Sequence, residues 1–269
     1  MLDSLAPARR RLVLVLSGIG VATAVVIGAL LLVPGARSDP PVQSDQNVLG
    51  PVLLVPGYGG STGSLQSLAA RITSVGRDAT VMGLPDNGTG DLASSAAALD
   101  RAARAALSRT GANSVDVVGY SAGGVVARQW VADGGATVVR RVITLGSPHH
   151  GTTLADLAGS AGLGNCPSAC RQLTSDSDLL RRLNAGDETP TGPTWVSIWT
   201  TQDETVTPPD SANLAGALNL PVQSICPEAA ISHGELPTAP LVQAMVLAEL
   251  AAGQPVPLSA EDCERLDET

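Results

Sequence analysis

From residue 51 onward, short apolar runs alternate along the chain with longer segments in which apolar residues recur at helical spacing. The runs rich in β-branched residues predict six strands, over residues 51–55, 79–82, 114–118, 141–145, 194–200 and 221–225. The helical spacing predicts helices over residues 65–75, 92–109, 122–132 and 238–252. Strands that alternate with helices indicate an α/β fold, a mainly parallel sheet of about six strands flanked by helices.

Residues 151–193 interrupt this alternation. They contain a Gly/Ser-rich stretch, two cysteines and one amphipathic segment around residues 179–183. We therefore predict one domain over residues 51–269, with a short cap-like insertion at about 151–193.

The first 37 residues have a different pattern. Arg9, Arg10 and Arg11 precede an uninterrupted uncharged run over residues 12–33, and a helix of that length spans roughly 33 Å, the thickness of a bilayer core. We favour an uncleaved signal-anchor with the arginines in the cytoplasm. A cleaved signal peptide is the alternative, although the sequence after Val33 is a poor cleavage site. The domain is expected to be exported in either case. Residues 38–50 are predicted to form a linker.

Composition limits the partners of the domain. The 269 residues are 44% hydrophobic and only 2% aromatic, and the formal net charge is −9. Binding of nucleic acid needs a basic face and aromatic stacking platforms, so the composition argues against this class of partner. No obligate protein partner is evident from the sequence.

All four cysteines lie beyond the apolar run, and an even number in an oxidising compartment favours disulfides. Three pairings are possible. We prefer Cys166 with Cys170, which closes a short loop, and Cys226 with Cys263, which ties the C-terminal tail to the domain. A zinc site is disfavoured because no two tight C-x-x-C pairs are present.

The stretch "VVGYSAGG" joins a predicted strand to a predicted helix and places Ser121 between Gly119 and Gly123. A G-x-S-x-G pentapeptide at such a junction is typical of a nucleophile elbow, where small residues let two backbone segments cross closely. A serine hydroxyl is a weak nucleophile, so it also needs a base, an acid that orients the base, and donors for an oxyanion.

Four pieces of the chain carry a resemblance: "VLLVPGYGGS", "VVGYSAGGVVAR", "ITLGSPHHGT", and "IWTTQDETVTPPDSA" followed by "ISHGELPT". With them, residues 47–252 resemble exported bacterial lipases and esterases of the α/β-hydrolase superfamily, close to the class 2 lipases. The resemblance implies a serine hydrolase that cleaves lipid or other carboxylic esters through an acyl-enzyme, without a cofactor. It also implies the chain order serine, acid, histidine.

His233 is the only histidine that follows a plausible acid, so it is the expected base. For the acid we choose Asp203, just past the strand predicted over residues 194–200. Glu204 would point the other way if the alternation of the strand continued. Three other aspartates remain alternatives, namely Asp178, Asp187 and Asp210.

The expected oxyanion donors are two backbone N–H groups, one from Ala122 after the nucleophile and one from Tyr58 in the loop after the first strand. The family usually has His-Gly at the start of that loop, whereas this chain has Pro56-Gly57. The change removes a side chain but keeps the Tyr58 donor.

His149 and His150 follow the strand beside that of the nucleophile, so we expect them to line the rim of the site or to hold its loops; without a third ligand they do not indicate a metal. The sequence Asn87-Gly88-Thr89 matches a glycosylation sequon, but within "PDNGTGD" we interpret it as a turn.

Two other functions fit the same fold. An acyltransferase would use the same three side chains with an alcohol in place of water. A non-catalytic binding module would be expected to have lost one of them, but Ser121, Asp203 and His233 are all present.

Overall fold

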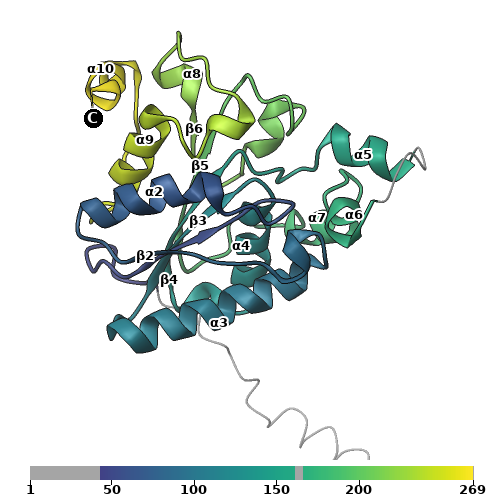
Figure 1. The fold of residues 1–269 in the computed structure, drawn as a ribbon, viewed down its shortest axis with the longest axis horizontal. Coiled ribbons are helices and arrows are strands. Elements are labelled where there is room, and N and C mark those ends of the chain that lie inside the picture. The colour runs from purple at the N-terminus through teal and green to yellow at the C-terminus, as the bar shows by residue number, and fades with distance from the viewer. Residues whose placement is uncertain (1–42, 161–165, 269) are drawn as a thin grey trace, which may run out of the picture. The chain divides into compact units, whose positions relative to one another are not determined.

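A computed structural model of the protein describes residues 43–160 and 166–268. Six parallel strands form its sheet in the order β2-β1-β3-β4-β5-β6 (Figure 1). Their bounds are Val52–Val55 (β1), Ala79–Val81 (β2), Val115–Tyr120 (β3), Val139–Leu145 (β4), Thr194–Trp199 (β5) and Leu218–Pro221 (β6). The α/β prediction is confirmed.

Helices cover both faces of the sheet (Figure 1). Helices α3 (Leu92–Thr110) and α4 (Ala122–Ala132) pack in the core on one face, and α2 (Gly63–Ser74) and α9 (Pro240–Leu250) pack in the core on the other. The remaining helices are α5 (Thr153–Ser160), α6 (Ser168–Gln172), α7 (Asp178–Leu183), α8 (Val222–Ile225) and α10 (Cys263–Asp267). The short 3-10 turns are η1 (Pro85–Gly88), η2 (Gly135–Thr137), η3 (Pro209–Ala212), η4 (His233–Glu235) and η5 (Ala260–Asp262).

Helix α3 illustrates how the sequence determines an element. The Asp91 side chain accepts a hydrogen bond from the Ala93 N–H and caps the first turn, and Gly111 in the left-handed conformation ends the helix. The buried residues recur at helical spacing, so one stripe faces the sheet. They are Leu92, Ser95, Ala96, Leu99, Ala103 and Ala106.

The strand predicted over residues 221–225 is wrong. The last strand is β6 (Leu218–Pro221), and the following four residues form the short helix α8. Pro221 has no N–H to continue the ladder, and its φ of −64° suits the position before a helix. Val222 and Ile225 are then buried three residues apart on one helical face.

The connection between β4 and β5 contains α5, α6 and α7, in the region where we predicted an insertion. Both preferred disulfides are present, Cys166–Cys170 beside α6 and Cys226–Cys263 between α8 and α10. The signal-anchor predicted over residues 12–33 lies outside the described residues. Within the described residues, no helix is long and apolar enough to cross a membrane.

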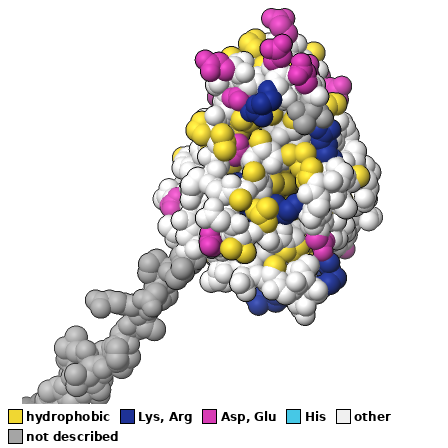
Figure 2. All heavy atoms as spheres, turned by 90° about the vertical axis from the view of Figure 1, so that its left-hand side faces the viewer, with side chains coloured by type: hydrophobic (Ala, Val, Ile, Leu, Met, Phe, Trp, Pro, Cys, Tyr) yellow, Lys and Arg dark blue, Asp and Glu magenta, His cyan; other side chains and the backbone are white. Residues whose placement is uncertain are grey.

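The face seen in Figure 2, which lies on the side of α2, α9 and α10 in Figure 1, has hydrophobic side chains in a hollow. Arginine and acidic side chains are interspersed around the hollow, and they form no continuous basic surface on this face of the described residues.

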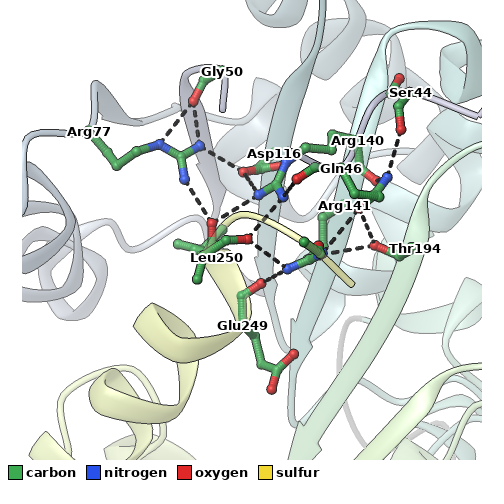
Figure 3. Close-up of polar contacts among 12 residues, drawn as sticks. Ser44, Gln46, Gly50, Arg77, Asp116, Arg140, Arg141, Thr194, Glu249 and Leu250 are labelled. Atoms are coloured by element: carbon green, nitrogen blue, oxygen red, sulfur yellow. Dashed lines mark hydrogen bonds and ion pairs between the residues drawn. The ribbon is translucent and has the colours of Figure 1, made fainter. Parts of the chain in front are cut away.

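A cluster of mostly buried charges, which was not predicted from the sequence, lies at the amino edge of the sheet (Figure 3). We name it the arginine cluster; its members are Arg77, Asp116, Arg140, Arg141 and Glu249. The three arginines donate hydrogen bonds to main-chain oxygens near the N-terminus of the described chain and at the end of α9. Because cations stabilise the C-terminal end of a helix, the cluster anchors α9 to the sheet.

Candidate active site

Ser121 lies in the sharp turn between β3 and α4, with φ of 54° and ψ of −127°. A positive φ is unfavourable for a residue with a side chain, so the surroundings must hold this conformation. The Ser121 N–H donates to the Leu145 carbonyl of the next strand at 2.8 Å. The turn therefore presents the Ser121 hydroxyl beyond the carboxyl edge of the sheet.

The two glycines of the pentapeptide are required by close backbone contacts. A Cβ atom on Gly119 would lie 2.6 Å from the Gly124 Cα, and one on Gly123 would lie 2.3 Å from the Val55 carbonyl oxygen. No side chain fits at either position, because real Cβ contacts are not that short. The motif is thus explained by the crossing of α4 with β1 and β3.

His233 connects Ser121 to Asp203. The His233 Nε2 atom lies 3.1 Å from the Ser121 Oγ, and the His233 Nδ1 lies 2.7 Å from the Asp203 Oδ2. Because the Asp203 carboxylate can only accept, His233 carries its proton on Nδ1. The lone pair of Nε2 is then directed at the Ser121 hydroxyl. Asp203 is 4% exposed and His233 7% exposed, so water screens this hydrogen-bonded chain only weakly.

The second oxygen of Asp203 is fixed by the backbone. Its Oδ1 accepts hydrogen bonds from the N–H groups of Thr205 at 2.9 Å and Val206 at 2.7 Å. These bonds orient the other oxygen towards His233. The three alternative aspartates have other neighbours: Asp178 pairs with Arg181, Asp187 accepts from Thr189, and Asp210 lies in η3.

The loop that carries His233 is held on both sides. Thr200 Oγ1 donates to the Ile231 carbonyl at 2.7 Å, and the Tyr120 hydroxyl donates to the His233 carbonyl at 3.2 Å. Burial, and to a lesser extent the charge of Asp203, raises the pKa of Tyr120 to about 12, so its phenol stays a donor. The Tyr120 ring also lies beside the imidazole, with 5.2 Å between centroids. Neither contact of Tyr120 was predicted from the sequence.

The loop "PGYGG" lies next to the serine. A Cβ atom on Gly57 would be 2.9 Å from the Ser121 Cβ, and the Gly60 N–H donates to the Gly57 carbonyl at 3.1 Å to close a turn over Tyr58 and Gly59. The Tyr58 side chain is 46% exposed. The Ala122 N–H is the first of α4, and such N–H groups have no acceptor within their own helix.

The two consecutive histidines have separate surroundings. His149 is fully buried with Nε2 3.1 Å from Thr144 Oγ1, and burial, with the charges of Arg128 and His150, lowers its pKa well below the usual value. His149 is therefore neutral. His150 contacts the Ser211 carbonyl at 3.2 Å and the Glu188 carboxylate at 3.0 Å, so it holds two loops together. Among the described residues, no group of three or more His, Cys, Asp and Glu could bind a metal ion.

Arg128 is a further buried residue that the sequence analysis missed. Its guanidinium donates to the Leu183 carbonyl at 2.8 Å and to the Asn184 side chain at 2.9 Å. Burial lowers its pKa to about 10, against the opposing charge of Glu188. Arg128 therefore connects helix α4, which follows Ser121, to the loop after α7.

Comparison with known protein families finds one family model that matches this chain. A family model described as "Lipase (class 2)" matches residues 101–230, a range that includes Ser121 and Asp203 and ends just before His233. No curated protein sequence matches the chain.

Many solved structures share the fold. Lipase B from Aspergillus fumigatus superposes with a TM-score of 0.67 at 21% identity, over 86% of this chain and 59% of that lipase. The mature form of the Bacillus licheniformis lipase BlEst2 gives a TM-score of 0.56 at 24% identity, over 68% of this chain and 86% of that chain. The chain thus spans little more than half the length of the fungal lipase.

Proposed function

We propose that this chain is a serine hydrolase that cleaves carboxylic esters through an acyl-enzyme, which its match to the class 2 lipase family model over residues 101–230 supports. The observation that supports the proposal most directly is the continuous hydrogen-bonded chain from Ser121 through His233 to Asp203. A nucleophile, a base and an orienting acid at these distances are the elements that acyl transfer requires.

In the proposed reaction, the Ser121 oxygen attacks the carbonyl carbon of the ester while His233 Nε2 takes the hydroxyl proton. The tetrahedral intermediate collapses, the bond to the leaving alkoxide breaks, and His233 returns the proton to that oxygen. Water then repeats the sequence on the acyl-enzyme, which releases the carboxylic acid and restores the Ser121 hydroxyl. Asp203 holds the Nδ1 proton throughout and stabilises the transient imidazolium.

The negative oxygen of each tetrahedral intermediate would be stabilised by the N–H groups of Tyr58 and Ala122. The turn that carries Tyr58 packs against Ser121, and Ala122 directly follows the nucleophile. Two backbone donors fixed in advance stabilise an oxyanion without reorganisation during the reaction. The chemistry proposed here uses only protein groups and water.

We further propose acylglycerols or related lipid esters as substrates, which the family match and the fold shared with lipases support. The domain would work outside the cytoplasm, held by a membrane anchor over residues 12–33 or secreted after cleavage. Two disulfides support this location, because such cross-links persist in oxidising compartments.

The decisive test is Ser121→Ala. We expect ester hydrolysis to fall by about 10³-fold or more, because the nucleophile is lost, while the melting temperature stays near that of the wild type. Activity should be measured on p-nitrophenyl esters of increasing chain length and on an emulsified triglyceride. A fluorophosphonate probe should label the wild-type protein at Ser121.

Ser74→Ala is the matched control, since Ser74 is an exposed serine at the end of α2. It should retain both the hydrolysis and the labelling. Near-normal turnover in Ser121→Ala, or labelling of a different serine, would refute the proposed function.

A further inference from the structure

Three consecutive residues before α3 adopt the left-handed backbone conformation. Asp86 and Asn87 both have φ of 50°, and Gly88 has φ of 68°. Only one of the three is glycine, and residues with a Cβ atom adopt this region at a cost of roughly 1 kcal/mol each. Such a run persists only where its surroundings fix it, so its neighbours indicate what it does.

The neighbours of this turn are the backbone atoms of the loop that carries Tyr58. A Cβ atom on Gly88 would lie 3.0 Å from the Gly60 nitrogen and 3.1 Å from the Gly57 carbonyl oxygen. These two atoms form the hydrogen bond that closes the turn over Tyr58 and Gly59. In the other direction, a Cβ atom on Gly60 would lie 2.7 Å from the Asn87 carbonyl group. The two turns are therefore in direct backbone contact.

The left-handed turn is itself held in place. Thr89 donates to the Asp86 carbonyl twice, from its N–H at 3.1 Å and from its hydroxyl at 2.8 Å. The Thr89 carbonyl accepts from the Ala169 N–H at the start of α6 at 3.1 Å. The Asn87 side chain is exposed, so the backbone, and not the amide group, makes the contact with the Tyr58 loop.

We infer that residues 86–89 are a positioning turn, which fixes the Tyr58 N–H at its place beside Ser121. The inference rests on the proposed function, because it assigns a task to the turn in the same reaction. The turn contacts the Tyr58 loop at the hydrogen bond that closes it. A shift of a few tenths of an ångström there moves the donor relative to the oxyanion, and donor placement controls the rate. Within the described residues, the hydrogen bonds and close contacts of residues 86–89 do not involve Ser121, Asp203 or His233.

The test compares two glycine substitutions in the full-length protein. Gly88→Ala and Gly111→Ala place alanine at nearly the same φ, 68° and 71°, so both destabilise by a similar backbone cost. A Cβ atom on Gly111 meets no other atom within 4 Å, whereas one on Gly88 presses on the hydrogen bond of the Tyr58 loop. We expect kcat to fall about tenfold in Gly88→Ala with KM within about twofold, and Gly111→Ala to keep both constants.

A second pair uses milder changes, in case Gly88→Ala does not fold. Thr89→Val removes the hydroxyl that holds the turn, and Thr110→Val removes a hydroxyl that donates to a helix carbonyl at the same 2.8 Å in α3. We expect Thr89→Val to lower kcat by about two- to tenfold, the equivalent of one hydrogen bond, and Thr110→Val to leave it unchanged. Melting temperatures measured in parallel correct each rate for the folded fraction.

Equal rates per folded molecule in both members of each pair would overturn the inference. Labelling of wild-type Ser121 by the fluorophosphonate is measured first, and it separates the two hypotheses. If the wild type is neither labelled nor active, the proposed function fails. If the wild type is labelled and the turn variants are labelled at the same rate, only the positioning role fails.

Discussion

Asp203 and Asp116 are both buried aspartates, but they lie at opposite edges of the sheet and have different partners. Asp203 follows the carboxyl end of β5 and is bonded to two backbone N–H groups and to His233. Asp116 lies near the amino end of β3 and is bonded to Arg140 at 2.8 and 2.5 Å and to Arg77 at 2.7 Å. Each carboxylate is compensated, one by neutral donors and an imidazole, the other by two guanidinium groups.

The difference lies in what each partner can do with a proton. A guanidinium keeps its charge at all ordinary pH values, so the arrangement around Asp116 is permanent and serves the fold. An imidazole can accept a proton on one ring nitrogen and release it again, so the charge beside Asp203 can appear during a reaction and vanish afterwards. The same residue type is therefore structural at one edge and, we propose, catalytic at the other.

Replacing Asp203 gives the largest expected effect. In Asp203→Asn, the amide no longer holds the proton on His233 Nδ1 or stabilises the imidazolium, so kcat should fall by about 10⁴-fold while the fold remains. The measurement is ester hydrolysis beside the melting temperature. Asp210→Asn is the control, because Asp210 lies in η3 and should tolerate the change. A silent Asp203→Asn with a severe Asp210→Asn would show that the acid is misassigned.

Replacing Asp116 should lower the stability of the fold and leave the rate of ester hydrolysis unchanged. Asp116→Asn leaves the fully buried Arg140 without a carboxylate, and breaking a buried ion pair on one side costs about 3–5 kcal/mol of unfolding free energy. The rate per active site, counted by fluorophosphonate titration, should stay unchanged. Denaturant unfolding measures the stability.

The matched control for Asp116 is Asp178→Asn, which removes an exposed pair with Arg181 and should cost less than about 1 kcal/mol. If Asp116→Asn and Asp178→Asn were equally stable, the arginine cluster would have no structural role. If Asp116→Asn lowered the rate per site as strongly as Asp203→Asn, the distinction between the two edges would be lost.

The sheet could be predicted because the spacing of apolar residues that marks a strand or a helix lies within a few consecutive residues. Five of the six strands and the long helices lie where apolar runs and helical spacing predicted them, and the misplaced strand lies where Pro221 divides one apolar run into β6 and α8. A short apolar run fits either element, and here the burial of Val222 and Ile225 against the core decided it.

The candidate site was partly predictable. The sequence itself gives the order of Ser121, Asp203 and His233 and the spacing of the glycines. The contacts of Tyr120 and Gly88 could not be predicted, because they form only when distant segments meet in the fold. The arginine cluster left a signal that we did not use: Asp116, Arg140 and Arg141 are charges inside otherwise apolar strands. Charges in such positions are rare unless they are paired, and the pairing depends on register between strands.

A third carboxylate, that of Glu249, differs from both because it has no strong partner. Glu249 is fully buried at the end of α9, where Oε2 accepts from the Val256 N–H at 3.2 Å and Oε1 has no partner among the described residues. Burial raises the pKa of Glu249 to about 7, against the opposing effects of the Val256 hydrogen bond and the charge of Arg141. Glu249 is thus the carboxylate of the arginine cluster that titrates near neutral pH.

The smallest effect, a dependence of stability on pH, follows from this raised pKa. The folded pKa of about 7 lies above the ordinary value of 4.5, so the folded state favours the protonated acid. The contribution of the raised pKa of Glu249 to the free energy of unfolding is therefore fully present below pH 4.5 and is lost as the pH rises through 7. Glu249→Gln keeps the shape and an acceptor for Val256 but cannot ionise. Its stability relative to the wild type should therefore increase by about 1.5 kcal/mol between pH 5.5 and 7. Denaturant unfolding of both proteins at several pH values measures this difference, and parallel curves would show that Glu249 ionises as it does in the unfolded chain.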